Sequence, residues 1–260
     1  MNTVSNTSVA IVTGASQGIG RSTALRLARD FGRVVLVARN ADHLADTSVH
    51  VVAAGAQTLV LPADLGQPDV PSMIVEETLR KFGRIDAVLN IAGAVPQIDL
   101  FDMTDEQWYA GTELKLHGAR RLTLKAWPAL VESGGSVVFT SGNSAQFPKS
   151  PYAAVGTINA AIVALAKAFS ERGLKDGVQV NSVMPGPVMT GRRESYLAKW
   201  AGDHNLSLEQ ATSTFLAHAG IRRYGTPEEI ADLMAFLVSP GARWLTGSAI
   251  RMDGGEVSAI

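Results

Sequence analysis

Near its amino terminus the chain reads Val9-Ala-Ile-Val-Thr13, then Gly14-Ala-Ser-Gln-Gly18-Ile-Gly20, then the helical pattern RSTALRLARDF over residues 21–31. An apolar run, a glycine-rich turn and a helix in this order are typical of the start of a βαβ unit. The glycines let the backbone approach a ligand closely, and the helix N-terminus favours negative charge. Although the spacing is not the standard G-x-G-x-x-G, its place predicts a dinucleotide pyrophosphate site at Gly14, Ser16, Gly18, Ile19 and Gly20.

The alternation of strand and helix continues along the whole chain. Short apolar runs predict strands at residues 9–13, 34–38, 58–61, 87–90, 136–140, 179–184 and 248–253. Helical patterns lie between them at residues 18–31, 41–54, 68–82, 104–130, 152–172 and 227–238. Strands that are almost wholly apolar are typical of a parallel sheet covered on both faces. We therefore expect an α/β fold, a doubly wound parallel seven-stranded (Rossmann) sheet, forming a single domain over residues 1–260.

Residues 190–224 interrupt this alternation, because the segment is too long for an ordinary connection between a strand and a helix. It holds aromatic and basic residues, such as Arg192 and Trp200, in weak helical patterns. Ligands of open α/β sheets lie beyond the carboxyl ends of the strands, where such a segment would cover them. We interpret it as a lid over a substrate pocket, in preference to a surface excursion.

The composition excludes several classes of partner and site. The formal net charge of −1 gives no electrostatic reason to expect a nucleic acid or an anionic membrane. The chain has no Cys, and its five His show no paired metal-ligand spacing, so we expect no metal. The first ten residues, MNTVSNTSVA, contain neither a cationic nor a long apolar segment, so we expect no signal peptide and a cytoplasmic location.

The segment of residues 160–169 is apolar nearly all round. Its most apolar part, residues 160–166, ends at Lys167 and is far too short to span a bilayer. A helix that flanks a sheet should expose a polar side, so this one predicts burial against a second subunit.

Further motifs resemble those of a single family. The sequence TGASQGIG of residues 13–20 resembles the TGxxxGxG loop of short-chain dehydrogenases/reductases, and the resemblance covers nearly the whole chain. DL at residues 64–65, NIAG at 90–93 and PGPVMT at 185–190 are similar to further family segments. The resemblance implies a nicotinamide cofactor and a homodimer or homotetramer. It also implies that the cofactor contacts Asp64, Leu65, Asn90, Ala92, Gly93, Pro185, Gly186, Val188 and Thr190.

The end of the second predicted strand bears on which nicotinamide cofactor is bound. An acidic residue there would hydrogen-bond the ribose 2′-hydroxyl and repel a 2′-phosphate. This chain instead has Ala38 followed by Arg39, whose guanidinium can form a forked contact with phosphate. We therefore expect NADP rather than NAD, the alternative being that Arg39 is a solvent-exposed arginine.

Carbonyl reduction needs a hydride donor, a proton donor and a group that polarises the oxygen. A tyrosine phenol, with a pKa of about 10, becomes a workable acid near neutrality only beside a cation. The family usually supplies that cation from the Lys of a YxxxK motif, and it has an Asn on the preceding helix. Here Gly156 follows Tyr152 where that Lys is expected, and Lys115 stands where the Asn is usual. We hypothesise that Lys115 supplies the charge, that Gly156 leaves it room, and that Asn159 hydrogen-bonds it; alternatively, Lys115 is an exposed surface lysine.

The serine that polarises the carbonyl is ambiguous, because the position usual in the family falls on Gly142. Either Ser141 or Ser144 could present a hydroxyl, and we select Ser141, at the end of its strand. We expect an NADP(H)-dependent oxidoreductase that interconverts a ketone or aldehyde and an alcohol. Tyr152 would be the general acid, Ser141 the polarising group and Lys115 the electrostatic partner. The alternative is a catalytically weak or inactive NADP-binding protein that regulates a partner.

Overall fold

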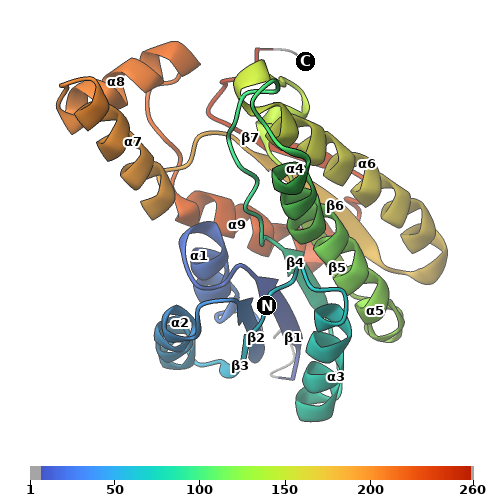
Figure 1. Ribbon diagram of the computed structural model, residues 1–260. Coiled ribbons are helices and arrows are strands. Elements are labelled where there is room, and N and C mark those ends of the chain that lie inside the picture. The colour runs from blue at the N-terminus through green and yellow to red at the C-terminus, as the bar shows by residue number, and fades with distance from the viewer. Residues whose placement is uncertain (1–6, 259–260) are drawn as a thin grey trace.

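The computed structural model describes residues 7–258, so the prediction made from the first ten residues lies largely outside the described residues. Seven parallel strands form one sheet in the order β3-β2-β1-β4-β5-β6-β7 (Figure 1). This confirms the predicted fold class. The strands are β1 Val9–Thr13, β2 Arg33–Ala38, β3 Gln57–Pro62, β4 Ala87–Asn90, β5 Ser136–Thr140, β6 Gln179–Pro185 and β7 Ala249–Met252. The strand order reverses between β1 and β4, which is where an open α/β sheet binds its ligands.

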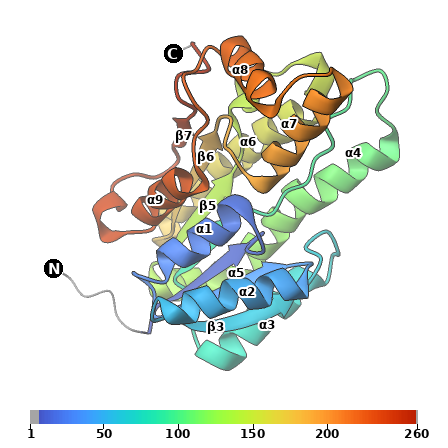
Figure 2. The ribbon, with the colours of Figure 1, turned by 90° about the vertical axis from the view of Figure 1, so that its left-hand side faces the viewer.

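Helices cover both faces of the sheet (Figures 1 and 2). Alternate residues of each strand feed two separate cores, so that Val12 packs with one helical layer and Ile11 with the other. The first layer consists of α1 Gly18–Leu27, α2 Ala41–Ala53 and α9 Pro227–Leu237. The second consists of α3 Val70–Phe82, α5 Gly118–Ser133 and α6 Ala153–Asp176.

The helix predicted over residues 104–130 is not continuous. It comprises α4 Asp105–Thr112, a π-helical turn at Glu113–His117, and α5. A π-helical turn holds one more residue than an α-helical turn, and such turns are frequent at functional sites. Lys115 lies within this turn.

The segment predicted as a lid forms two helices, α7 Gly191–Asp203 and α8 Leu208–Ala219, which extend to the upper left in Figure 1. Trp200 of α7 packs edge-on against Phe215 of α8, with ring centroids 5.1 Å apart. The two ends of the segment meet, because the Met189 N–H donates to the Gly225 carbonyl at 2.8 Å and the Gly225 N–H donates to the Pro187 carbonyl at 3.0 Å. Residues 190–224 are therefore a helical hairpin with tied ends.

Several predicted helix boundaries are wrong. The helix α1 ends at Leu27 rather than at Phe31, and α5 ends at Ser133 rather than at Leu130. The helix α6 was predicted over residues 152–172, directly before Gly173, but continues to Asp176 and is capped by Gly177, whose φ is 75°. A Cβ at Gly173 would lie 2.1 Å from the Val178 carbonyl oxygen, so this glycine permits close packing rather than a helix end. The helix α3 begins at Val70, two residues later than predicted, with Pro71 in its first turn.

Residues 160–166, which were expected to be too short to span a bilayer, lie within the longer helical segment Ser150–Asp176, which is long and apolar enough to do so by length and composition alone. In the structure it packs on the sheet through Ile162, Ala166 and Phe169. This side of the helix is therefore packed against the sheet, as in the helical layer of a globular α/β protein.

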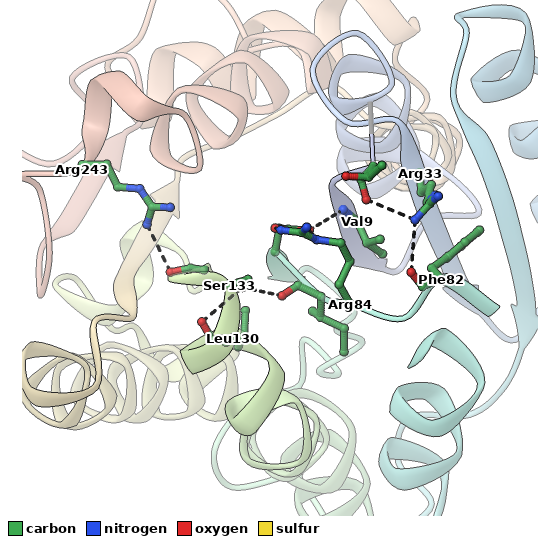
Figure 3. Close-up of polar contacts among 11 residues, drawn as sticks. Val9, Arg33, Phe82, Arg84, Leu130, Ser133 and Arg243 are labelled. Carbon is green, nitrogen blue, oxygen red and sulfur yellow. Dashed lines mark hydrogen bonds and ion pairs between the residues drawn. The ribbon is translucent and has the colours of Figure 1, made fainter. Parts of the chain in front are cut away.

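Polar contacts fix the edge of the sheet at the amino ends of the strands (Figure 3). Asp86 accepts a hydrogen bond from the Val9 N–H at 2.8 Å and pairs with Arg84 at 2.6 Å. Arg33 donates to the Phe82 carbonyl at 3.1 Å. These contacts belong to the structural end of the sheet, opposite the ligand-binding edge.

Candidate active site

A cavity of about 550 Å³ lies at the carboxyl ends of the strands and extends from β2 across β1 and β4 to β5. This volume suits a small-molecule or cofactor site. Ten of the predicted cofactor residues line it: Gly14, Ser16, Gly18, Ile19, Gly20, Arg39, Leu65, Ala92, Gly93 and Thr190. The carboxyl ends of the strands therefore form a cavity where the strand order reverses, and most of the predicted cofactor residues line it.

The glycine-rich turn fits a pyrophosphate for steric reasons. Gly14 has a φ of 69°, which side-chain-bearing residues rarely adopt. A Cβ at Gly20 would lie 2.1 Å from the Gly14 carbonyl oxygen, so only glycine allows the turn to close. The side chain of Thr13 fixes this turn to the next strand, because its Oγ1 accepts hydrogen bonds from Ile91 N at 2.9 Å and Ala92 N at 3.0 Å.

The end of the cavity beside β2 carries a free positive charge. Arg39 lines it together with Asn40 and His43, and forms no ion pair with any residue between 7 and 258. A nearby acid on α2, Asp46, is paired with Arg21 at 2.7 Å. The positive charge at this end of the cavity therefore favours binding of a phosphate group.

Five predicted cofactor residues do not line this cavity: Asp64, Asn90, Pro185, Gly186 and Val188. The Asp64 side chain closes a turn by accepting the Gly66 N–H at 3.0 Å. Asn90 is buried behind the site and donates to Thr123 at 3.1 Å, because it lies on β4 facing α5. A Cβ at Gly186 would lie 2.5 Å from Asp253, so this glycine serves packing against the C-terminal turn. Of the predicted PGPVMT segment, only Thr190 reaches the cavity.

Of the predicted catalytic residues Tyr152, Ser141 and Lys115, none lines this cavity, but Leu114 and Gly93, which adjoin Lys115, do line it. The side-chain carbons of Lys115 run along Gly93, where a Cβ would lie 3.0 Å from Lys115 Cδ. Its ammonium donates to the Ser141 carbonyl at 3.2 Å and to the side-chain oxygen of Asn159. The expected hydrogen bond between Lys115 and Asn159 is therefore present, and Lys115 is not an exposed surface lysine.

The amide of Asn159 is held in one orientation. Its oxygen accepts from Lys115, and its Nδ2 donates to Ser144 Oγ at 2.8 Å. The amide lies directly over Gly142, since a Cβ there would be 2.6 Å from Nδ2. Asn159 is thus the residue at which the strand end, the loop after β5 and the π-helical turn converge.

The expectation that Gly156 leaves room for Lys115 is wrong. A Cβ at Gly156 would lie 2.9 Å from Pro148 Cβ and 3.1 Å from the Ser144 carbonyl oxygen, so Gly156 accommodates the loop before α6. The glycine that leaves room for Lys115 is Gly93.

The structure separates the two candidate serines. The hydroxyl of Ser141 is buried and donates to the Asn159 backbone carbonyl at 2.7 Å, which uses its single proton. The hydroxyl of Ser144 accepts from Asn159, so its own proton is free. Tyr152 precedes α6 as its N-cap residue, and its phenol has no hydrogen-bond partner within the described chain.

Burial lowers the pKa of Lys115 to about 8, and repulsion from the Arg192 guanidinium acts in the same direction. Arg192 is at the base of the lid and lines the same cavity. Near neutral pH the amine is thus close to the point at which it exchanges a proton.

Comparisons with known proteins agree with this architecture. A family model described as enoyl-(acyl carrier protein) reductase matches residues 14–256. The 3-oxoacyl-[acyl-carrier-protein] reductase of Synechocystis is 32% identical over 258 residues, which cover 96% of each chain. A short-chain reductase protein of Streptomyces niveus is 29% identical, covering 97% of this chain and 95% of that one. The chain belongs to the short-chain dehydrogenase/reductase family.

Solved structures place this short-chain dehydrogenase/reductase among oxidoreductases. The L-sorbose reductase of Gluconobacter frateurii, complexed with NADPH and L-sorbose, superposes with a TM-score of 0.94 at 27% identity, covering 97% of both chains. An actinorhodin polyketide ketoreductase with NADPH gives a TM-score of 0.89 at 28% identity, covering 96% of this chain and 97% of that one. The protein is accordingly an oxidoreductase of the carbonyl reductase type.

Sequence reasoning missed several residues of the short-chain dehydrogenase/reductase site. Thr140, at the end of β5, lines the cavity, and its buried hydroxyl has no partner within the described chain. Its place at a strand end was a usable signal, because ligands lie beyond such ends. Arg192 was noted only as a lid residue. The other residues missed are Thr13, Gln17, Val37, Ala38, Asn40, His43, Ala63, Ile91, Ala94, Leu114 and Gly191.

Proposed function

We propose that the protein reduces a ketone or an aldehyde to an alcohol with NADPH, at the end of the cavity where Lys115 meets Asn159. The observation that carries the proposal is a buried ammonium of lowered pKa beside a cavity whose far end bears the unpaired Arg39. NADPH, when bound, supplies the hydride. The glycine-rich turn and Arg39 would hold its phosphates.

The chain's own residues divide the remaining tasks. Arg39 would contact the 2′-phosphate through a charge-assisted hydrogen bond. Lys115 would stabilise the negative charge that develops on the carbonyl oxygen. Tyr152 precedes α6, and no hydrogen bond within the described residues ties its phenol to Lys115 or Asn159, so we assign it no part in the reaction. Ser144 replaces Ser141 as the better candidate for polarising the carbonyl, because its proton is free.

The helical hairpin of residues 190–224 would cover the substrate. Its first residues, Thr190 to Arg192, line the cavity, and Thr190 lies against the glycine-rich turn: a Cβ at Gly18 would be 3.3 Å from Thr190 Cγ2. Because its two ends are tied, the hairpin can move as a unit. Substrate size would therefore be set by α7 and α8.

A panel of ketones, aldehydes and keto acids tests the function, with NADPH oxidation followed at 340 nm and the alcohols identified by chiral chromatography. We expect turnover with at least one carbonyl class, and a preference for NADPH over NADH. Tight NADPH binding in calorimetry with no turnover on any carbonyl would refute it.

The outer face of α6 is the surface through which a second copy of the chain would bind. Ala160, Ala164 and Ala168 are exposed on its outer side, so a second copy of the chain would cover an apolar helix face. We propose a homodimer or homotetramer assembled through this face and located in the cytoplasm. Sedimentation equilibrium measures the assembly, and a monomer at micromolar concentration would contradict it.

A further inference from the structure

We propose that Lys115 is itself the proton donor of the reaction, giving a proton from its ammonium to the carbonyl oxygen, and that the phenol of Tyr152 is not required. This inference rests on the function proposed above. It changes the role of Lys115 from an electrostatic partner to a catalytic residue.

The hydrogen bonds of Lys115 leave one proton available. An ammonium carries three N–H donors. Two of them are directed to the Ser141 carbonyl and the Asn159 side-chain oxygen. No third acceptor is found among residues 7–258, and neither of the two acceptors is charged. The third proton is therefore held by no carboxylate and can pass to a substrate.

The Lys115 side chain lies directly against a residue that lines the cavity. Gly93 lines the cavity, and the Lys115 side chain packs on that residue. Leu114 and Thr140, beside Lys115 and Ser141 in the sequence, line the same end. In the sheet, β4 and β5 lie on one side of β1, whereas Arg39 directly follows β2 on the other side. A cofactor whose adenosine phosphate meets Arg39 would therefore bring its nicotinamide toward Lys115.

The surroundings prepare the amine to release a proton near neutrality. Burial is the main cause of its lowered pKa, and Arg192 adds repulsion. The nearby Glu113 does not oppose this, because it is paired with Arg121 at 2.7 Å. The helices packed on the π-helical turn are α4, α5 and α6. The titratable groups nearest to Lys115 on the turn and on these helices are His117, Tyr109, Arg120 and Arg121, and residues 153–166 of α6 carry none.

The reaction moves one hydride and one proton to the carbonyl group. The carbonyl carbon receives the hydride, its C=O double bond becomes a single bond, and the oxygen takes the proton from Lys115 Nζ. The product is a neutral alcohol, the nicotinamide is oxidised, and Lys115 is left as a neutral amine that regains a proton from solvent. A neutral amine beside Arg192 is the state that burial and charge repulsion both favour.

Three variants separate proton donation from electrostatics. Lys115→Arg keeps the positive charge but does not release its proton, since a guanidinium stays protonated. We expect Lys115→Arg and Lys115→Met each to lose about 100-fold or more in kcat, the range for removing a general acid. We expect Tyr152→Phe to keep kcat within about threefold of the wild type. Melting temperature and NADPH affinity, measured for each variant, control for folding and cofactor binding.

The pH dependence gives a second test. In the wild type, kcat/KM for reduction should fall as pH rises through about 8, because the ammonium deprotonates. Asn159→Asp places a carboxylate against the ammonium and should move that decline to higher pH by about one unit or more. Asn159→Leu, which removes the acceptor, should move it to lower pH.

The pKa of Lys115 can also be measured independently of turnover, in the protein without cofactor. Competitive acetylation with acetic anhydride, analysed by mass spectrometry over pH 6–11, measures the titration of Lys115 against that of the exposed Lys125. We expect the Lys115 midpoint at about 8, well below that of Lys125.

Each outcome is decisive. Retention of activity by Lys115→Arg together with a large loss in Tyr152→Phe would overturn the inference and leave Lys115 as an electrostatic partner. A Lys115 midpoint equal to that of Lys125, with turnover intact, would also overturn it. No turnover by the wild type on any carbonyl would refute the proposed function and the proton transfer with it, whatever the acetylation shows.

Discussion

Lys115, on a π-helical turn, and Asn159, on α6, are joined by a hydrogen bond from ammonium to amide oxygen across 44 positions of sequence. The same amide lies over Gly142, the position at which the family usually carries its serine. Position 159, and not Gly156, is therefore where the polar groups of the site converge. The pair provides the cation that the helix after β5 lacks.

Cofactor choice should depend on Arg39. We expect Arg39→Ala to raise KM for NADPH about 10- to 100-fold, because a charge-assisted hydrogen bond to phosphate is lost. KM for NADH should change little, since NADH has no 2′-phosphate. Steady-state kinetics with both cofactors measures this, and equal effects on the two would contradict the assignment.

The close contact between Gly93 and Lys115 makes Gly93→Ala a test of the lysine's placement. The added Cβ would lie 3.0 Å from Lys115 Cδ, so the lysine side chain must shift by a few tenths of an ångström, which disturbs its hydrogen bond to Asn159. We expect kcat to fall about 10-fold or more through misplacement of one reacting group. The control is Gly202→Ala, on the outer part of α7, where an added Cβ meets nothing within 4 Å. Equal kinetics for the two variants would show that this contact is unimportant.

We expect that a serine at position 142, where the family usually has one, does not restore the family's catalytic arrangement. In Gly142→Ser the new Cβ would lie 2.6 Å from Asn159 Nδ2, which forces the amide away from Ser144 and Lys115. We expect a loss of about 1–3 kcal/mol in the free energy of unfolding and lower kcat, because buried polar groups lose their partners. Urea denaturation measures the first effect. A variant that is both as stable and more active would refute this description of the network.

Lys115 should also make folding stability depend on alkaline pH. Its pKa is lower in the folded protein, about 8, than the ordinary value of 10.5, so the unfolded chain binds more protons between these values. Stability due to this group therefore rises with pH from about 8 to 10.5, by an amount of the order of 3 kcal/mol. Lys115→Met removes the titrating group. The difference in unfolding free energy between Lys115→Met and the wild type should shrink as pH rises through that window, and a constant difference would show that Lys115 has an ordinary pKa.

The sheet was predictable because its signal is local. Each strand lies within one residue of the predicted range, since a run of buried β-branched residues specifies a parallel strand without reference to its neighbours. The glycine-rich turn was equally readable, and Gly14 and Gly20 have the steric roles expected of them.

What could not be predicted depends on packing between distant segments. Nothing in the local pattern shows whether a glycine makes room for a loop, as Gly156 does, or for a lysine, as Gly93 does. The burial of Asn90 behind the cavity likewise follows from its contact with Thr123, which lies on another helix. The π-helical turn was missed because one extra residue hardly alters a helical hydrophobic pattern.

That π-helical turn makes the chemistry of Lys115 sensitive to chain length as well as to residue identity. Deleting any one residue of Glu113–His117 would return the segment to an ordinary α-helical turn, which leaves the two flanks nearly in register but changes the directions of the side chains within the turn. The lysine would then leave its partner even though every side chain of the network was still encoded. A natural homologue that lacks one residue here would keep the glycine-rich turn for the nucleotide but would lose the lysine beside the cavity.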